Sequence, residues 1–248
     1  MGQLTMIIIN IFIQLICAVC MAIYSTHILY AFGSPNQELM FWSGTSAFSM
    51  LAATVVAELF LSADRFLAIS SPLAYARRIK GIVLGCILSC LVTFISAVGF
   101  AITQRLPEVS HATTFYQLVE ARWMVTSTSS ALTLCFCTVL ATVVVVVKIR
   151  SYNKQLRARN VVVSGTRSDT VKANSIVVYQ LILSLFLHVT PLVLNTALEV
   201  FCGTDLLIFT GFFPSTLASV YYAICGVLYW RKLKKRPRPN QTSNTVNN

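Results

Sequence analysis

Long apolar runs alternate with short polar connections along this chain. An α-helix needs about 20 apolar residues to cross a hydrocarbon core about 30 Å thick, and each run is at least that long. The pattern predicts an all-α membrane protein with six transmembrane helices in one bundle over 1–230, followed by a basic, disordered tail at 231–248. The predicted segments are 5–31, 39–63, 81–103, 123–147, 175–201 and 206–230.

The composition supports the same class. Of 248 residues, 56% are hydrophobic and 11% are charged, whereas an ordinary soluble domain has about 25% charged residues. The first run has no basic residues before it and is longer than the apolar core of a secretory signal, which spans roughly 7–15 residues. We therefore expect this run to be a retained membrane helix.

The basic residues predict the orientation of the helices. Of the 19 Lys and Arg residues, all but Arg105 and Arg122 lie at 64–80, at 148–174 or beyond residue 230. The positive-inside rule places these three segments in the cytoplasm, so both termini are expected there, in a multi-pass protein of the plasma membrane. Anionic membrane lipids are the expected partners of these cations, and no nucleic acid is expected to bind.

Neither a metal site nor an enzyme is predicted. Seven of the eight cysteines lie inside apolar runs, where they act as small packing residues. None has a His or an acid at metal-ligand spacing. The chain has no His-Glu-x-x-His, Gly-x-Ser-x-Gly or phosphate-binding loop. We expect no cofactor.

A few polar residues interrupt the apolar runs. An ionisable side chain inside a membrane helix is costly and faces the bundle interior, so each is a functional candidate. Glu58 lies seven residues before Arg65, about two helical turns, which places both on one stripe of a helix. Glu58 is either a functional group or, as we favour, a structural acid hydrogen-bonded to a neighbouring helix. Pro191, three residues after His188, should kink its helix.

Residues 58–80 read ELFLSADRFLAISSPLAYARRIK. Over about a dozen of these positions the sequence resembles the inner end of the third helix and the second intracellular loop of rhodopsin-like (class A) G-protein-coupled receptors. The acid, the Arg and the aromatic residue are Asp64, Arg65 and Phe66, and the later Pro and Tyr are Pro72 and Tyr75.

The resemblance numbers the helices. If 39–63 is the third helix of the family, the six predicted segments are helices two to seven and the first is missing. The charge pattern agrees, because a seven-helix receptor has its amino terminus outside and the loss of one crossing moves the new terminus inside. Met1 then begins either an incomplete gene model or isoform, or a true six-helix protein.

The chain also departs from the family pattern. The sixth helix of the family carries a Trp two residues before its Pro, but Val189 stands there; of Asn-Pro-x-x-Tyr in the seventh helix only Tyr222 remains. The connection at 104–122 has no Cys for the outer disulfide, and the first segment has no acid in place of the sodium-linked Asp. These differences favour a divergent chemosensory branch, similar to nematode serpentine receptors or odorant-receptor-like proteins.

The resemblance implies a mechanism. Arg65 would hold the cytoplasmic face closed through Asp64 and through helix six, and ligand binding would swing the Pro191 helix outward to admit a heterotrimeric G protein. The alternative for Asp64 and Arg65 is an interfacial anchor that fixes topology. The other residues assigned to this switch by resemblance are Phe66, Pro72, Tyr75 and Tyr222.

The expected ligand is a small, largely apolar molecule, because few fixed charges are available to recognise a charged one. Its pocket would lie among the outer halves of the helices. An interfacial position in the aromatic and polar belt explains most of the candidates equally well. The candidate ligand contacts are His27, Trp42, His188 and Glu199.

Three functions follow from these patterns. The favoured one is a G-protein-coupled chemosensory receptor. The second is a transporter or channel-like helical bundle, although no internal duplication is visible. The third is a non-signalling receptor fragment that pairs with a full receptor as its dimer partner.

Overall fold

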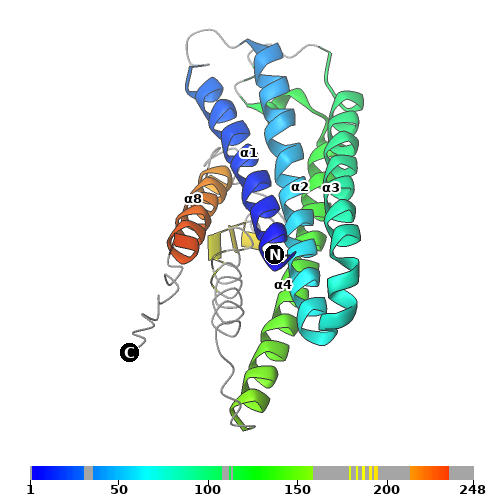
Figure 1. Cartoon of the computed structure of the whole chain (residues 1–248). Helices are drawn as coiled ribbons and strands as arrows, with labels where there is room; N and C mark the ends of the chain where they lie inside the picture. Colours follow the sequence, from blue (N-terminus) through cyan, green and yellow to red (C-terminus); the bar gives the residue numbers. More distant parts are fainter. Residues whose placement is uncertain are drawn as a thin grey trace, which may run out of the picture.

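The computed structural model describes residues 2–30, 36–107, 112, 114–158 and 213–234, with a few separate positions between 179 and 194. Across these residues the chain is almost entirely helical and contains no strand. Figure 1 shows the long helices side by side in a bundle. They are α1 (Gly2–Tyr30), α2 (Gln37–Ser70), α3 (Pro72–Thr103), α4 (Ala121–Ala158) and α8 (Phe213–Lys234), with a short 3-10 helix, η1 (Phe115–Leu118), before α4.

Local sequence signals set the limits of α2 and the start of α3. The side chain of Asn36 caps α2 by accepting a hydrogen bond from the Leu39 amide at 3.2 Å. Proline fits the first turn of a helix, where its missing N–H has no intrahelical partner to lose, and Pro72 begins α3 there. Ser71 alone separates the two helices. The predicted loop at 64–80 is therefore wrong: apart from Ser71, these residues extend the two helices, and Pro72 is compatible with that because it starts one.

Four helices are long and apolar enough to cross a membrane: Thr5–Leu29, Gln37–Ser70, Leu73–Thr103 and Val125–Ser151. Six were predicted, and among the described residues four helices meet these criteria. The segment at 175–201 lies almost wholly outside that part. The segment at 206–230 appears as α8, which begins only at Phe213 and whose Ser, Thr and Tyr residues dilute its apolar run.

Helix α2 is the centre of the bundle. It packs against α1, α3, α4 and η1, and α1 in turn packs against α8. Half of the most apolar window of α2 is buried, compared with 11% of that of α3, so α3 is a peripheral helix. In a membrane its exposed Leu and Ile side chains would face lipid.

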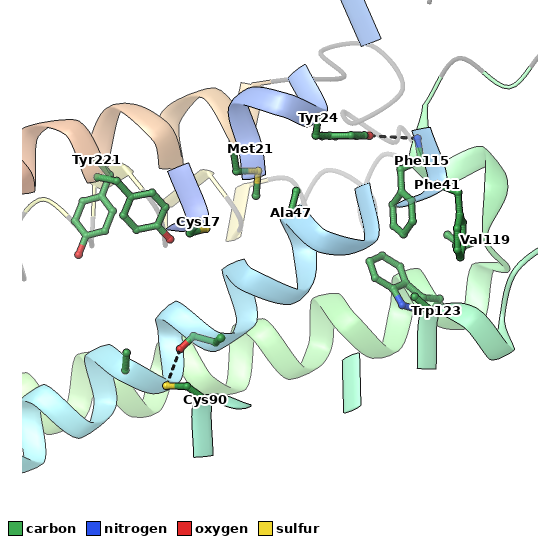
Figure 2. Close-up of a cluster of buried hydrophobic side chains, with 14 of the residues drawn as sticks. Cys17, Met21, Tyr24, Phe41, Ala47, Cys90, Phe115, Val119, Trp123 and Tyr221 are labelled. Atoms are coloured by element: carbon green, nitrogen blue, oxygen red, sulfur yellow. Dashed lines mark hydrogen bonds between the residues drawn. The ribbon is translucent and has the colours of Figure 1, made fainter. Parts of the chain in front are cut away.

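Small residues line one buried face of α2. Thr45, Ser49, Ala53 and Ala57 are all buried and are spaced four residues apart, which places them on one face of α2. The Cys90 thiol of α3 donates a hydrogen bond to the Ala53 carbonyl oxygen at 3.5 Å, as Figure 2 shows.

We name the two ends of the bundle after residues that they hold. The Glu38 end contains Tyr30, Gln37, Thr103 and Ala121, where α1 and α3 end and α2 and α4 begin. The Arg65 end contains Ser70 and Pro72. The two ends are separated by the length of α2, whose 34 residues extend about 50 Å at 1.5 Å per residue.

Candidate functional site

The cluster at the Arg65 end consists of Asp64, Arg65 and Tyr75. Asp64 and Arg65 lie in the last two turns of α2, yet their side chains are only 0% and 2% exposed, and Arg65 Nε lies 3.6 Å from Asp64 Oδ2. The Tyr75 hydroxyl, in the first turn of α3, donates to Asp64 Oδ1 at 2.8 Å. One carboxylate therefore interacts with its neighbour on α2 and with the next helix.

Burial determines what this pair contributes. Removing two charges from water costs several kcal/mol per ion, and the attraction between them offsets little more than that cost. Removing one partner, by contrast, costs about 3–5 kcal/mol because a buried charge is left unpaired. The pair therefore adds little net stability, but each buried charge needs a partner. Arg65 could meet this need in two arrangements, one with Asp64 and one with a different partner.

Phe66 and Pro72 have different surroundings from the pair. Phe66 is exposed, and Lys148 Nζ of α4 lies 5.9 Å from the centre of its ring, at the outer limit of a cation–π contact. Pro72 is the first residue of α3. The direct hydrogen bond to Asp64 is made by Tyr75.

Tyr222 lies far from the cluster. It is buried on α8, and its hydroxyl is 2.9 Å from Thr54 Oγ1. Thr54 is ten residues before Asp64, which is about 15 Å along α2. Pro191 is helical and buried, but most of its segment, including His188 and Val189, lies outside the described residues. The predicted contact of Arg65 with the sixth helix therefore also lies outside them.

A second polar cluster surrounds Glu58 in the middle of α2. Glu58 is buried, and its Oε1 accepts hydrogen bonds from the Tyr221 hydroxyl of α8 at 2.6 Å and from Gln14 Nε2 of α1 at 3.2 Å. The prediction of an acid hydrogen-bonded to a neighbouring helix is confirmed, with two helices as donors. Gln14 and Asn10, four residues apart in an apolar run, were not predicted; their spacing was the available signal.

Two of the four predicted ligand contacts, His27 and Trp42, lie in the described part of the chain. His27 lies partly buried in the last turn of α1. Trp42 is exposed, its ring centre lies 5.3 Å from that of Phe41, and its side chain hydrogen-bonds the Glu38 carboxylate, which fits the interfacial alternative. His188 and Glu199 are outside the described residues.

An aromatic cluster at the Glu38 end was not predicted. The Phe115 ring of η1 is fully buried, stacked on Phe48 at 5.4 Å and edge-on to Trp123 at 4.9 Å. Its backbone N–H donates to the Tyr24 hydroxyl oxygen at 3.2 Å, a contact drawn in Figure 2. Two adjacent aromatic residues, Phe115 and Tyr116, give no periodic pattern in a polar connection, so sequence reasoning treated 104–122 only as a loop.

Contacts around Arg105 hold this connection in place, where the sequence excluded a disulfide. Arg105 forms an isolated bridge with Val119, and its guanidinium binds the Glu38 carboxylate at 2.5 and 3.3 Å. The same guanidinium lies 4.6 Å from the centre of the Phe41 ring. The backbones of Leu106 and Leu118 are joined by a further hydrogen bond of 3.0 Å.

None of the described cysteines forms a disulfide. Seven are described and five of them are buried: Cys17, Cys86, Cys90, Cys135 and Cys225. Among the described residues no three His, Cys, Asp or Glu side chains are grouped as a metal site requires.

Comparison with protein-family models, with curated proteins and with solved structures found no match. The fold and the buried clusters therefore define a helical membrane-type bundle, and its function has to be argued from these clusters.

Proposed function

We propose that this protein is a divergent rhodopsin-like chemosensory receptor that binds a small apolar ligand and activates a heterotrimeric G protein. In this proposal α1, α2, α3, α4 and α8 are the second, third, fourth, fifth and seventh helices of such a receptor, and 175–201 is the sixth. The observation that carries the proposal is the buried Asp64–Arg65 pair at a helix end, with Asp64 hydrogen-bonded to Tyr75.

The cluster has the properties of a switch. Asp64 holds Arg65 on one side and the first turn of α3 on the other. If Arg65 turns towards a G protein, Tyr75 still donates a hydrogen bond to Asp64, so the carboxylate keeps a partner in both states. A ligand that converts such a switch from about 1% to 99% active must prefer the active state by roughly 5.5 kcal/mol.

Helix α2 links this switch to the opposite end. It is one continuous helix from Gln37 to Ser70, and it contacts α1, α3 and α4 along its length. A ligand at the Glu38 end that shifts α2 against these neighbours also shifts Arg65, because packed helices move as rigid elements.

Exposed cations surround the Arg65 end. Arg77, Arg78 and Lys80 project from the first turns of α3, and Lys148 and Arg150 from the second half of α4. In the proposed plasma-membrane topology this end and both termini are cytoplasmic. The cations would then bind anionic headgroups and help to dock the G protein.

Guanine-nucleotide exchange on a reconstituted heterotrimeric G protein tests the proposal. A panel of volatile apolar compounds supplies the ligand, and Arg65→Ala is compared with Arg78→Ala, which removes an exposed cation from the same end. We expect ligand-dependent exchange to be lost in Arg65→Ala and retained in Arg78→Ala at equal surface expression. Full exchange in Arg65→Ala would contradict the receptor mechanism.

The Glu58 cluster favours a transporter or channel as the second candidate. An acid that accepts hydrogen bonds from Gln14 and Tyr221 inside an apolar bundle is typical of ion pathways. Ion or proton flux into vesicles that is abolished by Glu58→Gln would support this function. The third candidate, a fragment that requires a receptor partner, predicts that the chain reaches the cell surface only when a full receptor is co-expressed.

A further inference from the structure

Phe115 occupies an aromatic socket at the Glu38 end. It belongs to the connection between α3 and α4, yet its side chain is fully buried between three helices. Figure 2 shows the ring lying among side chains of other elements. We define the Phe115 socket by the residues that surround it: Tyr24 of α1, Phe41, Gly44 and Phe48 of α2, and Trp123 of α4.

The socket has the shape of a slot for one planar ring. On one side the Phe115 ring lies directly on the backbone of α2, where a Cβ on Gly44 would come within 2.5 Å of it. Phe48 stacks on it with 23° between the ring planes, and Trp123 meets it edge-on at 83°. Stacked and edge-to-face contacts favour aromatic rings over aliphatic groups of the same size.

An exposed ion pair at the rim and the buried Phe115 ring inside both hold the connection. The ion pair that ties the connection to α2 joins Arg105, 33% exposed, to Glu38, 62% exposed, and exposed ion pairs contribute little to stability. Inside, the Phe115 N–H donates a 3.2 Å hydrogen bond to the Tyr24 hydroxyl oxygen. The buried Phe115 ring, more than the exposed ion pair, is therefore the interaction that a ligand must replace to open the connection, and the helices keep their own packing when it opens.

We infer that the Phe115 socket binds a small planar aromatic molecule, and that Phe115 is a tethered occupant which this molecule displaces. The inference rests on the proposed receptor function in that it names the class of its small apolar ligand. A ring of benzene size restores the stacking on Phe48 and the edge contact with Trp123. Displacement of Phe115 releases η1 from its place between α1, α2 and α4.

Fluorescence of Trp123 reports the occupancy of the socket. The chain has three Trp residues, so a variant with Trp42→Phe and Trp230→Phe keeps only Trp123. Bromobenzene is the probe, because its heavy atom quenches an indole that it touches. Quenching in lipid nanodiscs should saturate with bromobenzene and stay linear with bromocyclohexane, which has a similar size but no planar ring. A variant that keeps only Trp230 controls for partition into lipid.

Phe115→Ala removes the tethered competitor, with Phe136→Ala as the matched control because Phe136 is exposed on α4. A tethered group competes at roughly millimolar effective concentration, so Phe115→Ala should bind bromobenzene at least about tenfold more tightly. Equal affinities in the two Ala variants would overturn the inference. So would linear quenching of the protein that retains Phe115, even if Phe115→Ala binds the probe.

The same variants separate this inference from the proposed function. Saturable binding without guanine-nucleotide exchange would keep the socket and contradict the receptor. Exchange driven by an aromatic compound whose potency is unchanged in Phe115→Ala would keep the receptor and overturn the socket as its ligand site. If the Ala variant does not fold, Phe48→Leu gives the converse test: it removes one stacking face and should weaken probe binding.

Discussion

Substitution of Gly44 by Ala tests the packing of the Phe115 ring directly. The added Cβ would lie 2.5 Å from Phe115 Cγ and 2.6 Å from both Cβ and Cδ2, whereas ordinary contacts begin at 3.4 Å. Phe115 must therefore move by about 1 Å, since carbon atoms reach their optimal separation only at about 3.5–4.0 Å. Phe48 and Trp123 lie against the ring, so the movement disturbs them too.

Gly99→Ala is the matched control. It also replaces a helical glycine by alanine, but a Cβ on Gly99 meets nothing within 4 Å. Both variants gain up to about 1 kcal/mol from helix propensity, and only Gly44→Ala suffers overpacking, which costs about 1–3 kcal/mol. Gly44→Ala should therefore be less stable than Gly99→Ala by about 2 kcal/mol, or about 6 °C in Tm for a chain of this size.

The buried thiols provide the assay. A maleimide dye that fluoresces on reaction reports thermal unfolding as the five buried cysteines become exposed. In a Phe115→Gly background Cβ, Cγ and Cδ2 are all absent and the clash disappears, so Gly44→Ala should become as favourable as Gly99→Ala. Equal Tm values for the two glycine variants in the native background would refute the seating of Phe115 against α2.

Two further substitutions test the polar clusters. Tyr75→Phe removes the hydroxyl donor to Asp64 and should lower the free energy of unfolding by about 1–2 kcal/mol, as measured by the same thermal assay. Leu73→Ala, at an exposed position of the same helix turn, is the control. An equal loss of stability in both variants would argue against the contact. Glu58→Ala leaves the Tyr221 hydroxyl without this acceptor and should lower the free energy of unfolding by about 1–3 kcal/mol. Glu58→Gln keeps an acceptor oxygen and should lower it by less than half as much. Denaturant unfolding in detergent measures both variants, and equal losses would exclude a role for the acceptor.

Properties that depend on one stretch of sequence were predictable here. Length and apolarity identified the four spans, because crossing a membrane is a requirement on each helix separately. Glu58 was identified as a hydrogen-bonded acid for a similar reason, since a buried charge needs a partner wherever it lies. The apolar runs placed the end of α2 too early, because charged residues such as Asp64 and Arg65 end an apolar run without ending a helix.

Properties that depend on contacts between distant residues were not predictable. Glu58 meets Gln14 and Tyr221, which are 44 and 163 positions away, and nothing in the local pattern selects these two donors. Phe115 lies in a polar connection and becomes a core residue only because Gly44 leaves room for its ring. The sequence showed that polar and aromatic groups needed partners, and the fold determined which partners they met.

The single residue between α2 and α3 has a consequence for the biosynthesis of the chain. Asp64, Arg65 and Tyr75 all lie within twelve consecutive residues around Ser71, so a newly made α2–α3 hairpin already contains both groups of the ion pair and of the Tyr75–Asp64 hydrogen bond. It can enter the bilayer as a unit before α4 has been synthesised. Glu58 receives its Tyr221 donor only after the ribosome has made α8. In the order of synthesis, the charged turn is completed early and the acid at the centre of the bundle is completed last.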